Sequence, residues 1–251
     1  TKAGAGNLTL SGANTYTGTT TISAGTLTMG ASNVFDNSSN ITIGGGTLAM
    51  GSNTDTVNSL TITSGNLNGS GTLTASSYGL QGGTVSANLG TGTINATTST
   101  TALNGTAATT TITMNGGNIT LGNAGRLASG ANATITTGTL TLGGNEAINK
   151  LTLTGGTLAG TGTLTAATDY DLQSGTISAA LGGGVSLTKS TAGTVTLSGA
   201  NTYTGATTIK IDMTANKFST TAIEMVLTSR IGLEKFLRKE ISIIASKKFI
   251  Y

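Results

Sequence analysis

Residues 6–30 read GNLTLSGANTYTGTTTISAGTLTMG, and the rest of the chain repeats the pattern of this stretch. Near each end a glycine is followed by Asn or Thr and then by leucine, in Gly6-Asn7-Leu8 and Gly25-Thr26-Leu27. Beyond each glycine, apolar residues alternate with threonine, which is the period of two expected of a half-buried strand. Glycine adopts the positive φ angles that tight corners need. The stretch therefore predicts short strands joined by glycine corners.

The same tripeptide, glycine followed by Thr or Asn and then by Leu, Ile or Val, recurs along the chain. Its thirteen copies begin at Gly6, Gly25, Gly46, Gly65, Gly71, Gly83, Gly92, Gly117, Gly138, Gly156, Gly162, Gly175 and Gly193. Their main interval is about 20 residues, which is the length of one coil of a β-solenoid. We therefore expect an all-β fold, a single right-handed parallel β-solenoid of about ten coils, with an aliphatic interior and an exterior of Thr, Ser and Asn. At the spacing of neighbouring strands, ten coils make a rod about 50 Å long.

A longer repeat is superimposed on the coils. Residues 57–77 align with 148–168 at an offset of 91, and residues 78–94 align with 170–186 at an offset of 92. A third copy opens near the end, where NLTLSGANTYTGTTTI and TVTLSGANTYTGATTI, which start at Asn7 and Thr194, agree at 13 of 16 positions. We expect a solenoid over residues 1–209, made of superrepeats at about 7–98 and 99–193 and a partial third copy at 194–209.

Residues 210–251 do not continue the pattern. Glycine almost vanishes there, and the tail has eight basic and four acidic side chains, whereas residues 1–209 have four basic and five acidic. Thr221 and Glu224 form a capping box ahead of apolar residues at helical spacing. These apolar residues are Ile223, Val226, Leu227, Ile231 and Leu237. The sequence favours a short helical tail, which would be unrelated sequence, a cap over the open solenoid edge, or a basic helix at a membrane surface.

The composition excludes several kinds of functional site and several classes of protein. Cys and His are absent, so the chain has no thiolate nucleophile and no Cys or His ligand for a metal. A mean hydropathy of +0.14 and 36% hydrophobic residues are too high for a disordered chain. No apolar run reaches the roughly 20 residues of a membrane span. Residues 1–209 lack the stripe of basic side chains that nucleic-acid binding requires. We expect no cofactor, no metal, no nucleic-acid partner and no membrane insertion of this segment.

The best candidate for acid–base chemistry is the pair Asp169 and Asp171. If Tyr170 faces inward, both carboxylates face solvent about 7 Å apart, because residues i and i+2 share a strand face. That separation lies within the range of inverting glycosidases. The equivalent residues of the first superrepeat are Ser77 and Gly79, and we expect no basic side chain beside the pair. We therefore predict no catalytic residue, with a carbohydrate-active β-helix enzyme as an alternative.

Threonine pairs around a buried aliphatic residue offer a second alternative, an ice-binding face. The pairs stand at Thr26-Leu27-Thr28, Thr61-Ile62-Thr63, Thr139-Leu140-Thr141, Thr152-Leu153-Thr154 and Thr163-Leu164-Thr165. An ice-binding rank needs one pair per coil in constant register, and these pairs fall at irregular intervals. Threonine as the solvent-facing β-former is the simpler interpretation.

Residues 6–30, with LTLSGANTYTG followed by a Gly-Thr-Leu strand, resemble the autotransporter-associated β-strand repeat, also called the passenger-associated transport repeat. Residues 193–209 repeat the signature, and the resemblance does not reach the tail. It implies a type V secretion passenger, a right-handed parallel β-helix exported through an outer-membrane barrel and displayed on the bacterial cell surface. The implied role is a non-catalytic structural or adhesive segment that supports folding and secretion of the passenger. The candidate partners are a host or cell-surface receptor or a polysaccharide.

Overall fold

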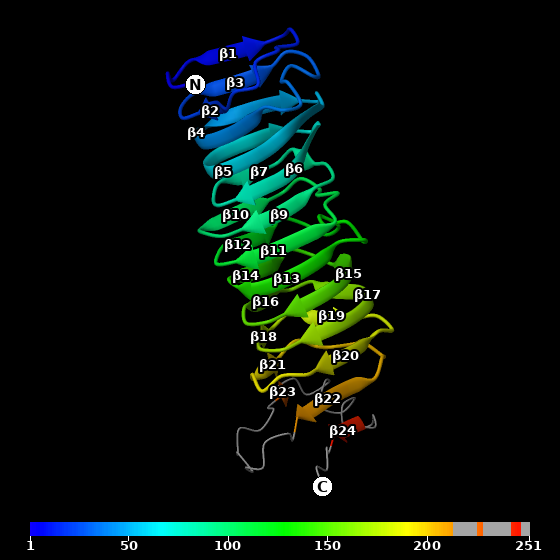
Figure 1. Cartoon of the computed structure of the whole chain (residues 1–251). Helices are drawn as coiled ribbons and strands as arrows, with labels where there is room; N and C mark the ends of the chain where they lie inside the picture. The colour runs from blue at the N-terminus through cyan, green and yellow to red at the C-terminus, as the bar shows by residue number, and fades with distance from the viewer. Residues whose placement is uncertain (213–224, 228–241, 247–251) are drawn as a thin grey trace.

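The computed structural model describes residues 1–212, 225–227 and 242–246. Over these residues the chain is an all-β parallel solenoid of about eleven turns, one more than the sequence predicts, and it contains no helix. All the described strand pairs are parallel, and they join strands of successive coils (Figure 1). The predicted fold class is confirmed.

Each coil passes through three faces, which we name A, B and C in chain order. Face A contains β2 (Thr20–Ile22), the start of β4 (Asn40–Gly51), the middle of β5 (Asp55–Gly69), the end of β6 (Thr72–Leu80), β9 (Thr93–Ala96), β11 (Thr111–Asn115), β13 (Asn132–Thr137), the ends of β15 (Glu146–Leu153) and β17 (Thr163–Leu172), β20 (Ser186–Lys189), β22 (Thr207–Asp212) and β24 (Ser242–Ser246).

Face B holds ten of the thirteen glycine-led tripeptides. It contains β1 (Asn7–Leu10), β3 (Thr26–Met29), the ends of β4 and β5, β7 (Thr84–Val85), β10 (Thr100–Leu103), β12 (Asn118–Leu121), β14 (Thr139–Leu142), β16 (Thr157–Gly160), β18 (Gly175–Ile177), β21 (Val195–Leu197) and β23 (Met225–Leu227). Face C is the shortest and contains the starts of β5, β6, β15 and β17, with β8 (Asn88–Leu89) and β19 (Ala180–Gly182).

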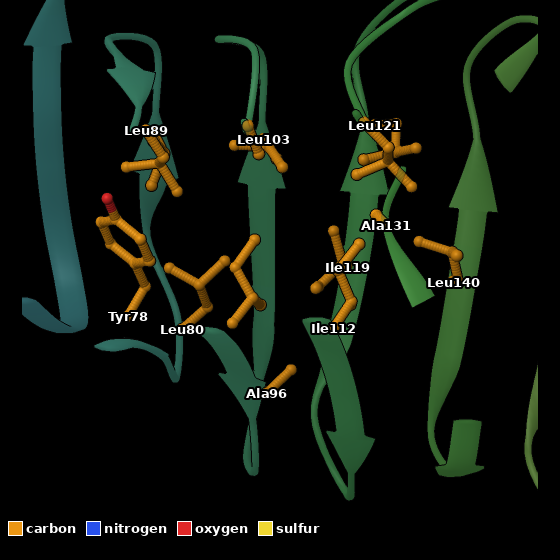
Figure 2. Packing of buried hydrophobic residues seen from close by; sticks show 14 of the residues in the cluster. Tyr78, Leu80, Leu89, Ala96, Leu103, Ile112, Ile119, Leu121, Ala131 and Leu140 are labelled. Atoms are coloured by element: carbon orange, nitrogen blue, oxygen red, sulfur yellow. The ribbon is translucent and has the colours of Figure 1, made fainter. Parts of the chain in front are cut away.

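The core is a stack of inward side chains in register from coil to coil (Figure 2). On face A one inward column runs through Ile41, Leu60, Tyr78, Ile94, Ile112, Ala133, Leu151, Tyr170 and Leu187. Each of these side chains is at most 1% exposed. Leu151 and Leu153 point inward while Thr152 points out, as the period of two predicts. Burial of aliphatic side chains therefore sets the strand register.

Glycine is required at two successive corners between faces A and B. Gly65 has a φ of +82°, and a Cβ on it would lie 2.2 Å from the carbonyl oxygen of Gly46 in the preceding coil. Gly83 stands one coil later with a φ of +75°, and a Cβ there would lie 2.3 Å from the oxygen of Gly65. Corners of successive coils stack this closely because no side chain separates them.

The two superrepeats share local geometry that their offset predicts. The Tyr78 hydroxyl accepts a hydrogen bond from the Ala75 N–H at 2.8 Å, and the Tyr170 hydroxyl accepts one from the Ala166 N–H at 2.9 Å. Each hydroxyl also donates to a carbonyl oxygen on its own strand. The boundaries of the superrepeats stay a prediction.

The described part of the tail departs from the helical expectation. Strand β22 continues past Ile209 to Asp212, β23 pairs with β21, and β24 pairs with β22. The helix is therefore wrong at Val226 and Leu227, which lie in β23. The last coils have unpaired backbone N–H and C=O groups at an open edge, and these groups can pair with an added strand. Pairing with that edge outweighs the local helix propensity of this segment. The expected capping box and the helix positions Ile223, Ile231 and Leu237 lie outside the described residues.

Candidate functional site

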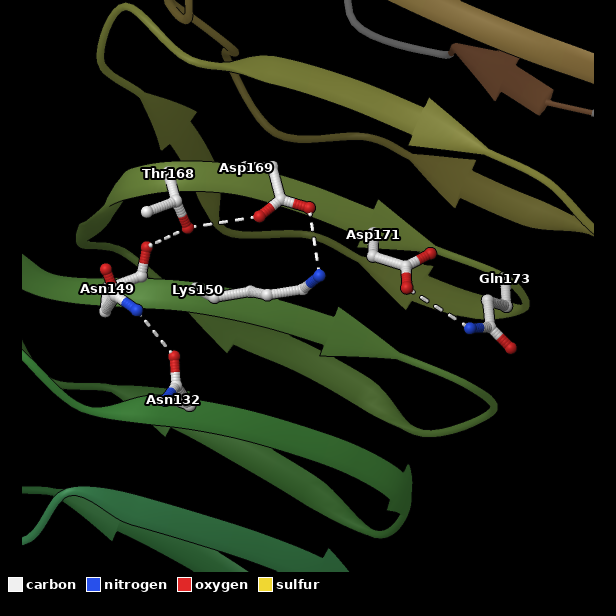
Figure 3. A network of polar contacts seen from close by, with 7 residues as sticks. All are labelled: Asn132, Asn149, Lys150, Thr168, Asp169, Asp171 and Gln173. Atoms are coloured by element: carbon white, nitrogen blue, oxygen red, sulfur yellow. Dashed lines mark hydrogen bonds and ion pairs between the residues drawn. The ribbon is translucent and has the colours of Figure 1, made fainter.

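The predicted carboxylate pair lies on the outer side of face A, at the end of β17. Asp169 and Asp171 are half-buried and point outward, while Tyr170 and Leu172 point into the core. Asp171 accepts a hydrogen bond from the Gln173 side-chain amide at 3.3 Å (Figure 3). The orientation that the strand pattern predicts is correct.

A basic side chain stands beside Asp169, and this corrects the expectation that none does. Lys150 Nζ lies 3.1 Å from Asp169 Oδ2, with the two side chains 37% and 30% exposed. Lys150 and Asp169 are register partners on β15 and β17. Their separation along the chain is one coil length, and this is the sequence signal that identifies such a pair. An ion pair this exposed contributes at most about 1 kcal/mol to stability.

Polar side chains extend this group over three coils (Figure 3). The Thr168 hydroxyl donates to the backbone oxygen of Asn149 at 2.9 Å, and the Asn149 side-chain amide donates to Asn132 Oδ1 at 2.8 Å. We name Lys150, Asp169 and Asp171 the charged cluster. Its equivalents in the first superrepeat are the short, uncharged Ser59, Ser77 and Gly79, whereas the asparagine pair is present in both copies as Asn40–Asn58 and Asn132–Asn149.

The charged cluster lies on an open strand face. A groove of about 380 Å³ lies at the other end of the rod, in the first coil, where its lining includes Leu8, Leu10 and Tyr16. Within the described part of the chain, no group of three or more acidic, His or Cys side chains could hold a metal ion. The cluster can bind a ligand through its partly exposed charges and hydrogen bonds.

The five threonine pairs do not form a rank, because they lie on three different faces. Thr26–Thr28 and Thr139–Thr141 lie on face B, Thr61–Thr63 and Thr152–Thr154 on face A, and Thr163–Thr165 on face C. Face A carries instead a single file of threonines, which the sequence analysis did not identify. In register order its positions are Thr21, Thr42, Thr61, Gly79, Asn95, Thr113, Thr134, Thr152, Asp171, Thr188 and Thr208.

Two acidic residues point into the solenoid on face C, and the sequence analysis missed both roles. Asp55 and Glu146 are each 2% exposed. Asp55 Oδ2 accepts hydrogen bonds from the N–H groups of Val34 at 2.8 Å and Phe35 at 3.1 Å. Burial raises the pKa of the Asp55 carboxyl, and the backbone N–H groups only partly offset that effect.

Glu146 repeats this arrangement one superrepeat later. Its two oxygens accept from the N–H groups of Arg126 at 2.9 Å and Leu127 at 3.0 Å. Both corners begin with a residue of positive φ, Asn33 at 56° and Gly125 at 66°. Successive N–H groups at such a turn form a concave anion site, and here a carboxylate of the same chain fills it. These carboxylates are internal ligands of the fold.

The comparison with protein families agrees with the sequence at both ends of the described solenoid. The family described as "Passenger-associated-transport-repeat" matches residues 1–29 and 187–210. The chain carries passenger-associated transport repeats. The matched segments overlap the resemblance seen at 6–30 and 193–209 and begin further toward the N-terminus, so that they include Lys2 and Lys189. Neither the curated proteins nor the solved structures gave a match. Among the described residues, no helix has the length and hydropathy of a membrane span.

The two passenger-associated transport repeats share a tyrosine arrangement. Tyr16 and Tyr203 each hydrogen-bond through the hydroxyl to the threonine four residues later, Thr20 at 3.0 Å and Thr207 at 2.9 Å. The ring of Tyr203 also packs edge-to-face on Tyr170, with ring centroids 6.2 Å apart. The second repeat is thereby joined to the coil that precedes it.

Each passenger-associated transport repeat also begins with an inward-pointing lysine. Lys189 is fully buried, and its Nζ donates to the backbone oxygen of Thr191 at 2.5 Å. Lys2 is 9% exposed, and its Nζ donates to the backbone oxygens of Gly4 and Ala24. Burial lowers the pKa of Lys189. Together with Asp55 and Glu146, these lysines place four of the nine charged residues of 1–209 in the interior.

Proposed function

We propose that this chain is a non-catalytic passenger segment of an autotransporter-like protein, displayed on the bacterial cell surface as a structural and adhesive rod. The observation that carries the proposal is the passenger-associated transport repeat at both ends of one parallel β-solenoid. Each coil contacts only its neighbours, so coils can stack one after another as the chain emerges from a secretion pore. The absence of Cys and Pro leaves no disulfide and no slow prolyl isomerisation to delay that process.

Surface display tests the structural part of this proposal. The chain would be fused ahead of an autotransporter barrel, and its exposure would be measured by protease digestion of intact cells. Replacing Leu151 and Leu153 by Asp puts charges into the core and should reduce display severalfold. Replacing Thr134 and Thr152 by Asp puts the same charges on the outer side of face A and should leave display nearly unchanged. Equal display of both variants would contradict export coupled to coil stacking.

The charged cluster is the proposed adhesive site. It is a departure from the first superrepeat that the fold does not require, because Ser59, Ser77 and Gly79 occupy the same positions there. The matched variant Lys150→Ser, Asp169→Ser, Asp171→Gly gives the second superrepeat the surface of the first. We expect it to fold normally and to adhere less to host cells or polysaccharide-coated surfaces. Unchanged adherence would remove the cluster from the proposal.

The two alternatives have separate tests. A carbohydrate-active enzyme would release reducing sugars from a panel of polysaccharides, and Asp169→Asn with Asp171→Asn would abolish that release. We expect none. An ice-binding face would inhibit ice recrystallisation, and we expect no inhibition because the threonine pairs lie on three faces and the single file on face A is interrupted at Gly79, Asn95 and Asp171.

A further inference from the structure

The corner between faces A and B has two lengths, and the length follows the residue that precedes it. Four residues separate the last inward side chain of face A from the first inward side chain of face B in nine coils. These corners are Ile22 to Leu27, Ile43 to Leu48, Ile62 to Leu67, Leu80 to Val85, Ala96 to Thr101, Met114 to Ile119, Ile135 to Leu140, Leu153 to Leu158 and Leu172 to Ile177. Five residues separate Lys189 from the buried Val195. Five also separate Lys2 from Leu8, which is 47% exposed in the first coil and lies in register with the buried Leu27.

Each lysine therefore replaces an apolar residue in the coils with a longer corner. Lys189 lies in register with Ile209, and Lys2 lies in register with Ile22, so both occupy positions that are aliphatic in the neighbouring coil. The described ion pair of the chain is Lys150–Asp169, and within residues 1–212 neither buried lysine has a carboxylate partner. Both ammonium groups donate instead to the carbonyl oxygen two residues later, in the corner itself.

The register changes across this corner by three residues, of which the fifth corner residue accounts for one. Before the corner Thr188 pairs with Asp171, and after it Val195 pairs with Gly175, so the numbering offset between partners grows from 17 to 20. In each longer corner the carbonyl group of residue i+2 accepts a hydrogen bond from the lysine ammonium, and an aliphatic side chain at the lysine position would leave it without that donor. A buried carbonyl group without a partner is destabilising. Lysine places three donors at the end of a flexible stem and can reach that group.

We propose that Lys2 and Lys189 are positioning residues that allow a fifth residue in the corner. The ammonium group binds the inward carbonyl of residue i+2, and the four-carbon stem fills the space of the aliphatic side chain that it replaces. The lysine and the fifth residue therefore form one unit, and neither is tolerated without the other. The passenger-associated transport repeat is on this account a coil with a longer corner between faces A and B.

The chain itself supplies the sequence for the test. Lys189-Ser-Thr-Ala-Gly-Thr becomes Ile-Ser-Ala-Gly-Thr when Lys189→Ile is combined with deletion of Thr191, and this is the sequence of the four-residue corner at 22–26. In the full chain, each single change should lower the urea midpoint by about 1 M, and the double change should recover most of that loss. Hydrogen exchange of β20 and β21 reports the same coil locally, with loss of protection in each single variant and recovery in the double.

The reverse change, made in another coil, provides a second and independent test. Ile22→Lys together with a threonine inserted after Ser23 builds the lysine corner in another coil. Ile22→Lys alone should be destabilising, and the inserted threonine should restore the midpoint. Effects that simply add at either site, so that each double variant is the least stable of its set, would overturn the proposal. Recovery at both sites would establish the lysine and the fifth residue as a unit.

Discussion

At the scale of single residues, the direction of a side chain decides what a substitution does. Leu153 is fully buried, whereas the neighbouring Thr152 is half-buried on the outer side of face A. Asp55, whose type suggests the surface, is buried and accepts three backbone hydrogen bonds. Position within the strand therefore outweighs residue type as a guide to energetic importance in this chain.

The inward and outward positions of β15 can be compared directly. We expect Leu153→Ala to lower the free energy of unfolding by about 2–5 kcal/mol, because it opens a cavity in a column of packed side chains. Thr152→Ser removes a methyl group on the outer side of the strand and should change that free energy by about 0.5 kcal/mol or less. Chemical denaturation followed by circular dichroism measures both. The opposite order would mean that the strand register is shifted by one residue.

Asp55 provides a second prediction at this scale. Asp55→Ala removes the acceptor for the Val34 and Phe35 N–H groups, and we expect a loss of about 1–3 kcal/mol because buried donors remain unpaired. Hydrogen exchange should show the loss at residues 33–35. Asp171→Asn is the matched control on the outer side and should leave stability and exchange unchanged. Equal effects of the two variants would argue against an internal ligand at Asp55.

At the scale of elements, strands and corners differ in how far the sequence determines them. The alternation of aliphatic residues with threonine predicts the strands and their direction because burial has a period of two. Contacts between coils are harder to predict, because coil length varies and determines which residues become register partners. Lys150 and Asp169 are an example, since the sequence around either residue does not indicate that it pairs with the other. Asp55 and Lys189 each lie two residues from an inward-pointing aliphatic residue, Val57 and Leu187, and therefore point inward as well. A search for hydrophobic periodicity overlooks charged residues at such positions.

Buried tyrosines make the strands of face A sensitive to alkali. Burial raises the pKa of Tyr78 to about 12 and also raises the pKa of Tyr170 and Tyr203. As pH rises past about 10, tyrosines of the unfolded chain lose their protons first, so the unfolded state binds fewer protons. Stability should be complete below about pH 10 and fall as pH rises toward 12.

The measurement is the urea midpoint as a function of pH, with tyrosine ionisation followed by ultraviolet absorbance. Ionisation of the buried tyrosines should coincide with loss of the β spectrum. Tyr78→Phe also loses the hydrogen bonds of the hydroxyl with Ala75, Leu73 and Thr91. Its overall stability should therefore be lower, but the decline above pH 10 should be shallower. Full ionisation near pH 10 with the solenoid intact would contradict the burial of these rings.

The end of the ladder gives a further element-scale prediction. In a chain that stops at Ile209, β21 and β22 lose the strands that pair with them, β23 and β24. We expect the β spectrum to persist, because the earlier coils keep their neighbours. The newly exposed edge should cause concentration-dependent association in sedimentation experiments. A truncated chain that stays monomeric at every concentration would show that this edge does not need the tail.

At the scale of the whole molecule, residues 1–209 form a stack whose exterior is almost uncharged. Five charged side chains of residues 1–209 lie outside the core, and three of them form the charged cluster in the second superrepeat. The first superrepeat has the same framework without the cluster. Such a molecule combines a repeated structural rod with one locally specialised surface, which fits the proposed role of a displayed passenger segment.

The constant register along face A can be measured directly, because the chain contains no cysteine and labels can be placed at will. Spin labels would be attached to cysteine at Thr42 and, in turn, at Thr113, Thr152 and Thr188, which stand four, six and eight coils further along one outward column. Pulsed electron–electron double resonance should give distances between the labels that rise linearly by about 4.8 Å per coil, to about 38 Å for the longest pair. Distances that stop rising, or that do not follow coil number, would contradict the parallel β-solenoid.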